Sequence, residues 1–148
     1  MPDTVDILYG VLQSGLLVSG NSDITLAKSV ASGDALSNQR ISGRTDAVYL
    51  YQGRTDIRPM LGPRYEAGDY VVAEVSVRFP TATTLNPNSG AGIVLRQRVN
   101  DFKTTIVSGT WPVSGVPRPF LTFEEWPLSH VNVAKAKLTY RFRFFDFE

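Results

Sequence analysis

The chain has 148 residues, of which 43% are hydrophobic and 20% charged, and its formal net charge is +1. This length and composition predict one folded domain over residues 1–148 and exclude a disordered chain. The near-neutral charge argues against nucleic acid as a partner. The sequence has no cysteine, and polar residues and glycines interrupt its early apolar stretch, Ile7 to Val18. We therefore expect no disulfides, no signal peptide and no membrane span.

The first half of the chain contains short runs rich in β-branched and aromatic residues, which are typical of strands. Only Leu26 to Leu36 is a candidate helix, and Gly33 weakens it. The predicted strands here are Asp6 to Leu12, Gly15 to Val18, Asp23 to Leu26 and Ala47 to Tyr51.

The clearest strand of the middle region is Tyr70 to Phe79, where apolar and polar residues alternate. The Gly- and Pro-containing stretch from Pro80 to Gly92 follows it and is expected to be a long loop, either a binding loop or a tolerated insertion. Beyond it, Gly92 to Val99 and Phe102 to Val107 are predicted to pair as a hairpin, closed by a turn at Asn100-Asp101.

The C-terminal region contains a short strand, Phe120 to Phe123, and a longer one that begins at Ala134. One side of the longer strand is apolar and ends with Phe142 and Phe144. The opposite side carries Arg141 and Arg143, and Phe145 and Phe147 then join that basic side.

About nine strands in a chain of this length are typical of two packed sheets. Helix-length apolar periodicity is not apparent in this interpretation, and most prolines fall between the apolar runs. The predicted fold class is therefore all-β, as a single antiparallel two-sheet β-sandwich resembling a jelly roll.

The sequence offers no recognisable catalytic centre, cofactor site or metal site. His130 is the only histidine, and no Gly-x-Ser-x-Gly or glycine-rich phosphate loop is present. Calcium needs only oxygen ligands, which turns such as Asn21-Ser22-Asp23 and Asn100-Asp101 contain, but neither turn matches a known calcium loop. We expect a protein that is not an enzyme and has no cofactor.

The candidate partner-binding residues are aromatic and arginine side chains, the types enriched where proteins meet. For each of them, burial in the chain's own core is the competing interpretation. The set comprises Arg141, Arg143, Phe145 and Phe147 at the C-terminus, and Trp111 and Trp126 between the last strands.

The pattern of a cysteine-free β-rich chain with loops rich in Gly, Pro, Thr and Asn, such as Pro80 to Gly92, resembles the small β-sandwich or jelly-roll decoration (cement) proteins of tailed bacteriophage capsids. The resemblance implies a homo-oligomer, a dimer or trimer, that is made in the host cytoplasm and stabilises the virion surface by binding major capsid proteins. It implies no membrane and no small-molecule ligand.

Three alternatives remain open. Another virion part, such as a tail or head-completion protein, fits the same pattern. A carbohydrate-binding β-sandwich would use Trp111, Trp126, Tyr49 and Tyr51 to stack on sugar rings. A small hydrolase of unrecognised type is the third.

Overall fold

The computed structural model describes residues 3–17, 21, 23–29, 46–78, 90–126 and 133–147. Strand accounts for 49% and helix for 26% of the structure, so that the expectation of a mostly β protein is confirmed. The elements in chain order are α1 (Thr4–Ser14), β1 (Thr25–Ser29), β2 (Ala47–Pro59), β3 (Arg64–Arg78), α3 (Gly90–Val107), β4 (Phe120–Glu125) and β5 (Val133–Phe147).

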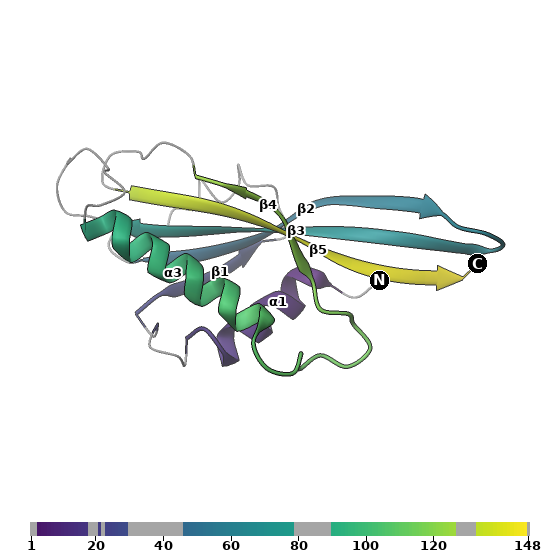
Figure 1. Ribbon diagram of the computed structural model, residues 1–148, viewed down its shortest axis with the longest axis horizontal. Helices are drawn as coiled ribbons and strands as arrows, with labels where there is room; N and C mark the ends of the chain where they lie inside the picture. The colour runs from purple at the N-terminus through teal and green to yellow at the C-terminus, as the bar shows by residue number, and fades with distance from the viewer. Residues whose placement is uncertain are drawn as a thin grey trace.

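The five strands form a single sheet in the order β1-β2-β3-β5-β4. β1 pairs with β2 in parallel, and every other pair is antiparallel. The described residues thus form one mixed sheet, and the expected two-sheet antiparallel sandwich with jelly-roll character is not found among them. Two helices, α1 and α3, take the place of the second sheet and lie against one face (Figure 1).

The prediction of a strand over Asp6 to Leu12 is wrong, because this segment belongs to α1. The Asp3 side chain accepts hydrogen bonds from the backbone N–H groups of Val5 and Asp6, which caps the first turn. The buried residues Val5, Leu8 and Leu12 recur every three or four positions, which is the period of a helix.

The predicted hairpin between residues 92 and 107 is also wrong, because α3 spans this region and contains the expected turn at Asn100-Asp101. The buried side chains of α3 again have helical spacing, and they are Leu95, Val99, Phe102 and Ile106. Residues 80–89 of the expected loop Pro80 to Gly92 lie outside the described residues, and Gly90 to Gly92 begin α3.

The strand predictions over 70–79, 134–144, 47–51 and 120–123 correspond to β3, β5, β2 and β4. The candidate helix over Leu26 to Leu36 is not confirmed where it is described, because Thr25–Ser29 is strand β1. The rest of that segment lies outside the described residues.

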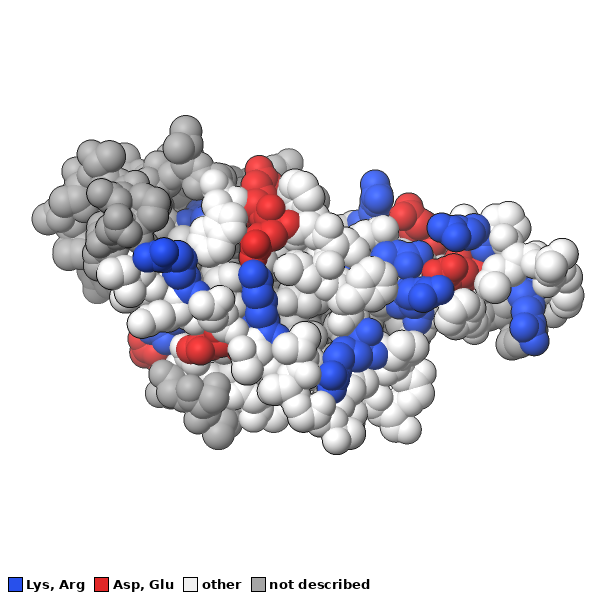
Figure 2. Space-filling model, viewed as in Figure 1, with Lys and Arg blue, Asp and Glu red and all other residues white. Residues whose placement is uncertain are grey.

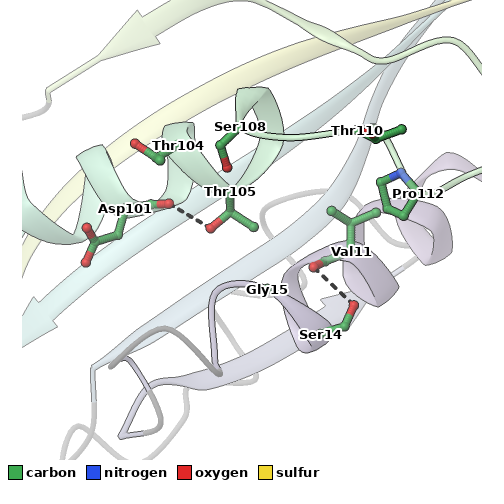
Figure 3. Close-up of a pocket in the computed structure, with 9 residues that line it drawn as sticks. All are labelled: Val11, Ser14, Gly15, Asp101, Thr104, Thr105, Ser108, Thr110 and Pro112. Carbon is green, nitrogen blue, oxygen red and sulfur yellow. Dashed lines mark hydrogen bonds between the residues drawn. The ribbon is translucent and has the colours of Figure 1, made fainter.

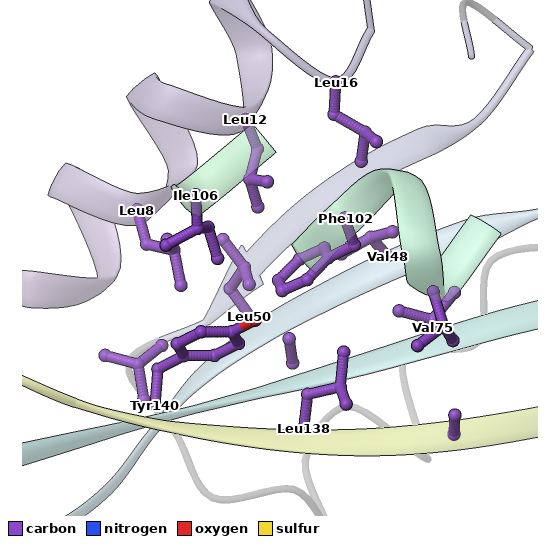
Figure 4. Close-up of a cluster of buried hydrophobic side chains, with 14 of the residues drawn as sticks. Leu8, Leu12, Leu16, Val48, Leu50, Val75, Phe102, Ile106, Leu138 and Tyr140 are labelled. Atoms are coloured by element: carbon purple, nitrogen blue, oxygen red, sulfur yellow. The ribbon is translucent and has the colours of Figure 1, made fainter. Parts of the chain in front are cut away.

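The core lies between the two helices and the sheet face that they cover (Figure 4). Leu8 and Leu12 of α1 and Phe102 and Ile106 of α3 point toward apolar residues of the strands. Phe102 contacts Tyr140 of β5 with ring centroids 5.7 Å apart. Every second residue of β3 and β5 therefore faces the core, and the residues between them occupy the other face of the sheet.

Candidate functional site

Three strands continue beyond the part of the sheet that the helices cover. The pairing of β1 with β2 ends at Tyr51, and the pairing of β4 with β5 ends at Arg141. Past these points only β2, β3 and β5 remain, and they project from the body of the molecule (Figure 1). We call residues 53–70 together with 141–147 the arm.

The tip of the arm is an exposed hairpin turn with apolar side chains. The backbone N–H of Met60 donates a 2.9 Å hydrogen bond to the Arg64 carbonyl, and Gly62 has a φ of 75°, a conformation that favours glycine. Leu61 is 95% exposed and Ile57 is 68% exposed. Apolar side chains this exposed on a projecting element are typical of a surface that another molecule covers.

A buried carboxylate, Asp69, lies where the arm joins the rest of the sheet, which we call the root of the arm. Asp69 is 5% exposed, and it accepts hydrogen bonds from the side chains of Thr4, Gln52 and Thr55, the last at 2.8 Å. Thr4 belongs to α1, whereas Gln52 and Thr55 flank the irregularity in the pairing of β2 with β3. Since a buried carboxylate needs such donors, Asp69 couples the direction of the arm to the helix layer.

Two arginines of β5 meet one glutamate on the arm face that points away from the helices. Arg141 Nη2 donates to Glu66 Oε1 at 3.2 Å, and Arg143 Nε donates to the same oxygen at 2.8 Å. The Glu66 residue is 6% exposed. Arg143, followed by Arg141, holds the pKa of the Glu66 carboxyl below its ordinary value, because both cations stabilise the ionised form.

Gly68 leaves the space that Arg141 occupies. A Cβ atom placed on Gly68 would lie 2.6 Å from the guanidinium carbon of Arg141, far inside normal contact distance. The guanidinium therefore lies flat across the strand, and its carbon is 5.9 Å from the centroid of the Tyr70 ring. Arg54 approaches the same ring at 4.8 Å, and Arg143 lies 5.3 Å from the Phe145 ring.

A groove adjoins these arginines on the same face. It has a volume of about 530 Å³ and crosses the sheet from β2 over β3 and β5 to the edge strand β4. Exposed aromatic residues of β4, Phe120 and Phe123, lie along this edge. The residues that line the groove are Gly53, Arg54, Tyr70, Val72, Thr122, Phe123 and Thr139.

The structure brings three of the six sequence-predicted residues together on the arm. Arg141, Arg143 and Phe145 lie in successive rows of the outward face, and Phe145 is 52% exposed. Phe147 pairs with Arg64 through its backbone. Figure 2 shows basic side chains, with acidic ones among them, gathered over the projecting strands.

The two tryptophans do not belong to this cluster. Trp111 is half-buried beside the core, where its indole N–H donates to the Val116 carbonyl at 2.8 Å and its ring lies 6.4 Å from that of Phe142. Trp126 follows β4 and is 45% exposed. Trp111 therefore contributes to packing, whereas Trp126 extends the exposed aromatic edge.

Sequence reasoning missed the partners of the arginines, namely Glu66, Gly68 and Tyr70. These residues lie on β3, and only the register of β3 with β5 places Gly68 opposite Arg143, Tyr70 opposite Arg141, and Glu66 opposite Phe145. It also missed Ile57 and Leu61, because no alternation marks β2 as a strand beyond Gln52. The Gly62-Pro63 pair between Leu61 and Arg64 was the available signal for a hairpin.

Residues of the two segments considered for calcium, Asn21 to Asp23 and Asn100-Asp101, lie around one arginine, Arg98. Arg98 donates to Asn21 at 2.6 Å and to Asp23 at 2.6 Å, and Asn21 donates to Asp101 at 3.1 Å. Arg98 also lies 3.3 Å from Asp46, so that this cation ties α3 to the start of β2. Within the part of the chain that is described, no group of three or more potential metal ligands occurs.

A second groove, of about 440 Å³, lies between α1 and the end of α3 (Figure 3). Two of the hydroxyl groups that line it donate within their own helices, Ser14 to the Gly10 carbonyl and Thr105 to the Asp101 carbonyl, both at 2.8 Å. Asp101, the charged residue of its lining, accepts a hydrogen bond from Asn21. His130, the only histidine, lies outside the described residues.

No protein-family model matches the chain, and no curated protein matches it in sequence. Among the described residues, no helix is both long enough and apolar enough to cross a membrane.

Proposed function

We propose that the chain is a non-enzymatic structural protein that binds neighbouring protein subunits through its arm. One observation carries this proposal: apolar side chains are exposed near the tip of the three-stranded arm. Leu61 is 95% exposed and Ile57 is 68% exposed. A rigid projection lowers the conformational entropy lost on binding, and apolar side chains at its end gain free energy when a partner covers them. The arm face also carries aromatic and arginine side chains, which are residue types enriched in protein interfaces.

We further propose that the assembly is a virion. This proposal draws on the resemblance to capsid decoration proteins. Of the features behind that resemblance, the chain has the high β content and the lack of cysteine. A single sheet with a projecting arm differs from a jelly roll, and it suits a protein that reaches between subunits. We therefore propose either a decoration protein bound to major capsid proteins or a tail or head-completion protein, acting as a homo-oligomer.

Two measurements test the proposal: whether the chain is present in virus particles, and whether its arm tip is needed for incorporation into them. Mass spectrometry of purified particles from the virus that encodes the chain is expected to find it in constant copy number. Leu61→Asp should abolish its incorporation, because an added charge at the tip opposes burial. Ile93→Asp is the matched control, since Ile93 is a 43% exposed apolar residue on α3, away from the arm. Absence of the protein from particles, or normal incorporation of Leu61→Asp, would overturn the proposal.

A further inference from the structure

The outward face of the arm carries more positive than negative charge. The residue pairs of β2, β3 and β5 place Arg58 in a row with Glu66, and Asp56 in a row with Gly68 and Arg143. Paired residues share a face of the sheet. The five basic residues of this face exceed its two acidic ones, Asp56 and Glu66, by three, and they are Arg54, Arg58, Arg64, Arg141 and Arg143.

The arginines next to the groove retain donors for a further anion. Arg141 and Arg143 share one oxygen of Glu66, and each bonds it through a single nitrogen. A guanidinium has five N–H donors. Arg54 and Arg141 each lie against the Tyr70 ring, with guanidinium carbons 4.8 Å and 5.9 Å from its centroid, and Arg54 also lies 3.6 Å from Asp56. Acidic side chains next to this ring would accept charge-assisted hydrogen bonds from the two guanidinium groups.

The groove beside these arginines combines apolar and polar groups. Val72 and Phe123 supply apolar surface, while Arg54, next to the Tyr70 ring, supplies the positive charge at one end. Phe123 is 59% exposed. A ligand that fits must therefore present a negative group next to an apolar one.

These features favour a protein segment over a nucleic acid. Glu66 lies at the centre of the arginine cluster and would repel a continuous line of phosphates. The net charge of the whole chain is only +1, which provides little long-range attraction for a polyanion.

We propose that the groove and the arginines beside it bind an acidic segment of a partner protein, in which acidic side chains contact Arg54 and Arg141 and a neighbouring apolar side chain lies against Phe123. This inference rests on the proposed function and names the chemistry of the partner. Gly68 is the positioning residue, because it allows Arg141 to lie over the sheet next to Tyr70.

The probe is a labelled short peptide in which glutamate alternates with leucine, and binding to the full chain is measured by fluorescence anisotropy. Wild type is expected to bind this peptide and to release it as salt is raised. Arg141→Gln and Gly68→Ala should each weaken binding about tenfold, the loss expected for one charge-assisted hydrogen bond. Arg96→Gln removes an exposed positive charge from α3 and should leave binding unchanged.

Two results would overturn the inference. One is equal binding by wild type, Arg141→Gln and Gly68→Ala, and the other is tighter binding of a single-stranded oligonucleotide of the same charge.

Measuring particle incorporation as well shows whether a failure lies in this inference or in the proposed function. If wild type fails to bind the peptide while Leu61→Asp still blocks incorporation, the acidic partner is wrong and the structural role stands. If wild type binds the peptide but is absent from particles, the structural role in a virion is wrong and the binding chemistry stands.

Discussion

The sheet beneath the helices and the arm that extends from it are built from the same strands but are stabilised in different ways. Under α1 and α3 the sheet is five strands wide and buries apolar side chains such as Leu50 and Leu138. In the arm only three strands remain, and apart from Ala67, Phe142 and Phe144, which extend the apolar cluster, its contacts are polar and centre on Asp69 and Glu66. Under the proposed function the body supplies stability and the arm supplies recognition, so that mutations should separate the two.

The largest effect on stability is expected in the body. Phe102→Ala removes a fully buried ring that packs against Tyr140, and it should lower the free energy of unfolding by about 3–5 kcal/mol. Chemical denaturation followed by circular dichroism measures this loss. Phe145→Ala removes the same group from an exposed position on the arm and should cost far less. Similar losses for the two variants would contradict the division between body and arm.

A smaller loss is expected at the root of the arm. Asp69→Ala leaves the side-chain donors of Thr4, Gln52 and Thr55 without their common acceptor, which should cost about 1–3 kcal/mol. Hydrogen exchange should become faster in residues 55–69 than in the β3 residues beneath the helices. A uniform rise in exchange over the whole sheet would show that Asp69 supports the body as well.

The contribution of Glu66 to the stability of the fold should depend on pH. Its folded-state pKa lies below the ordinary value of 4.5, so that it contributes stability above that pH, and this contribution is lost as the pH falls through the folded pKa. Glu66→Gln should therefore lower the melting temperature at neutral pH, and the difference from wild type should shrink below about pH 4.5. Glu125→Gln, on the exposed edge strand β4, is the charge-matched control. A Glu66→Gln difference that is the same at neutral and acidic pH would contradict the ion-pair assignment.

The smallest effect on stability is expected for Gly68→Ala. The added methyl group displaces the end of a flexible arginine side chain rather than backbone, and the change in the free energy of unfolding should stay within about 0.5 kcal/mol. Thermal denaturation tests this, and a loss as large as that of Asp69→Ala would place Gly68 among the residues that hold the arm together.

The sequence was sufficient to predict the strands that alternate cleanly, and β3 and β5 are confirmed. It also contained the helical spacing of Leu95, Val99 and Phe102, which was misread because Asn100-Asp101 resembled a hairpin turn. The outer half of β2 has no such pattern, since it is exposed and owes its strand conformation to pairing with β3.

The candidate site was predictable only in part, for a physical reason. Alternation in the last strand placed Arg141 and Arg143 on the side away from the core, which the structure bears out. Nothing local to those residues indicates that they share Glu66, which is 75 positions away from Arg141. Contacts across such distances depend on strand register, which a single sequence does not reveal.

The position of β5 beside the central strand also has a kinetic consequence. β3 can pair early with β2 through the short turn after Pro59, but its other edge must wait for β5, which begins only at Val133. Closing so long a segment is entropically costly, and folds dominated by distant pairings form slowly. During that interval the early hairpin presents an unpaired edge next to Val71 and Val75, to which a strand from another chain can add. Chain concentration during refolding, rather than the stability of the finished fold, should therefore set the yield of native protein.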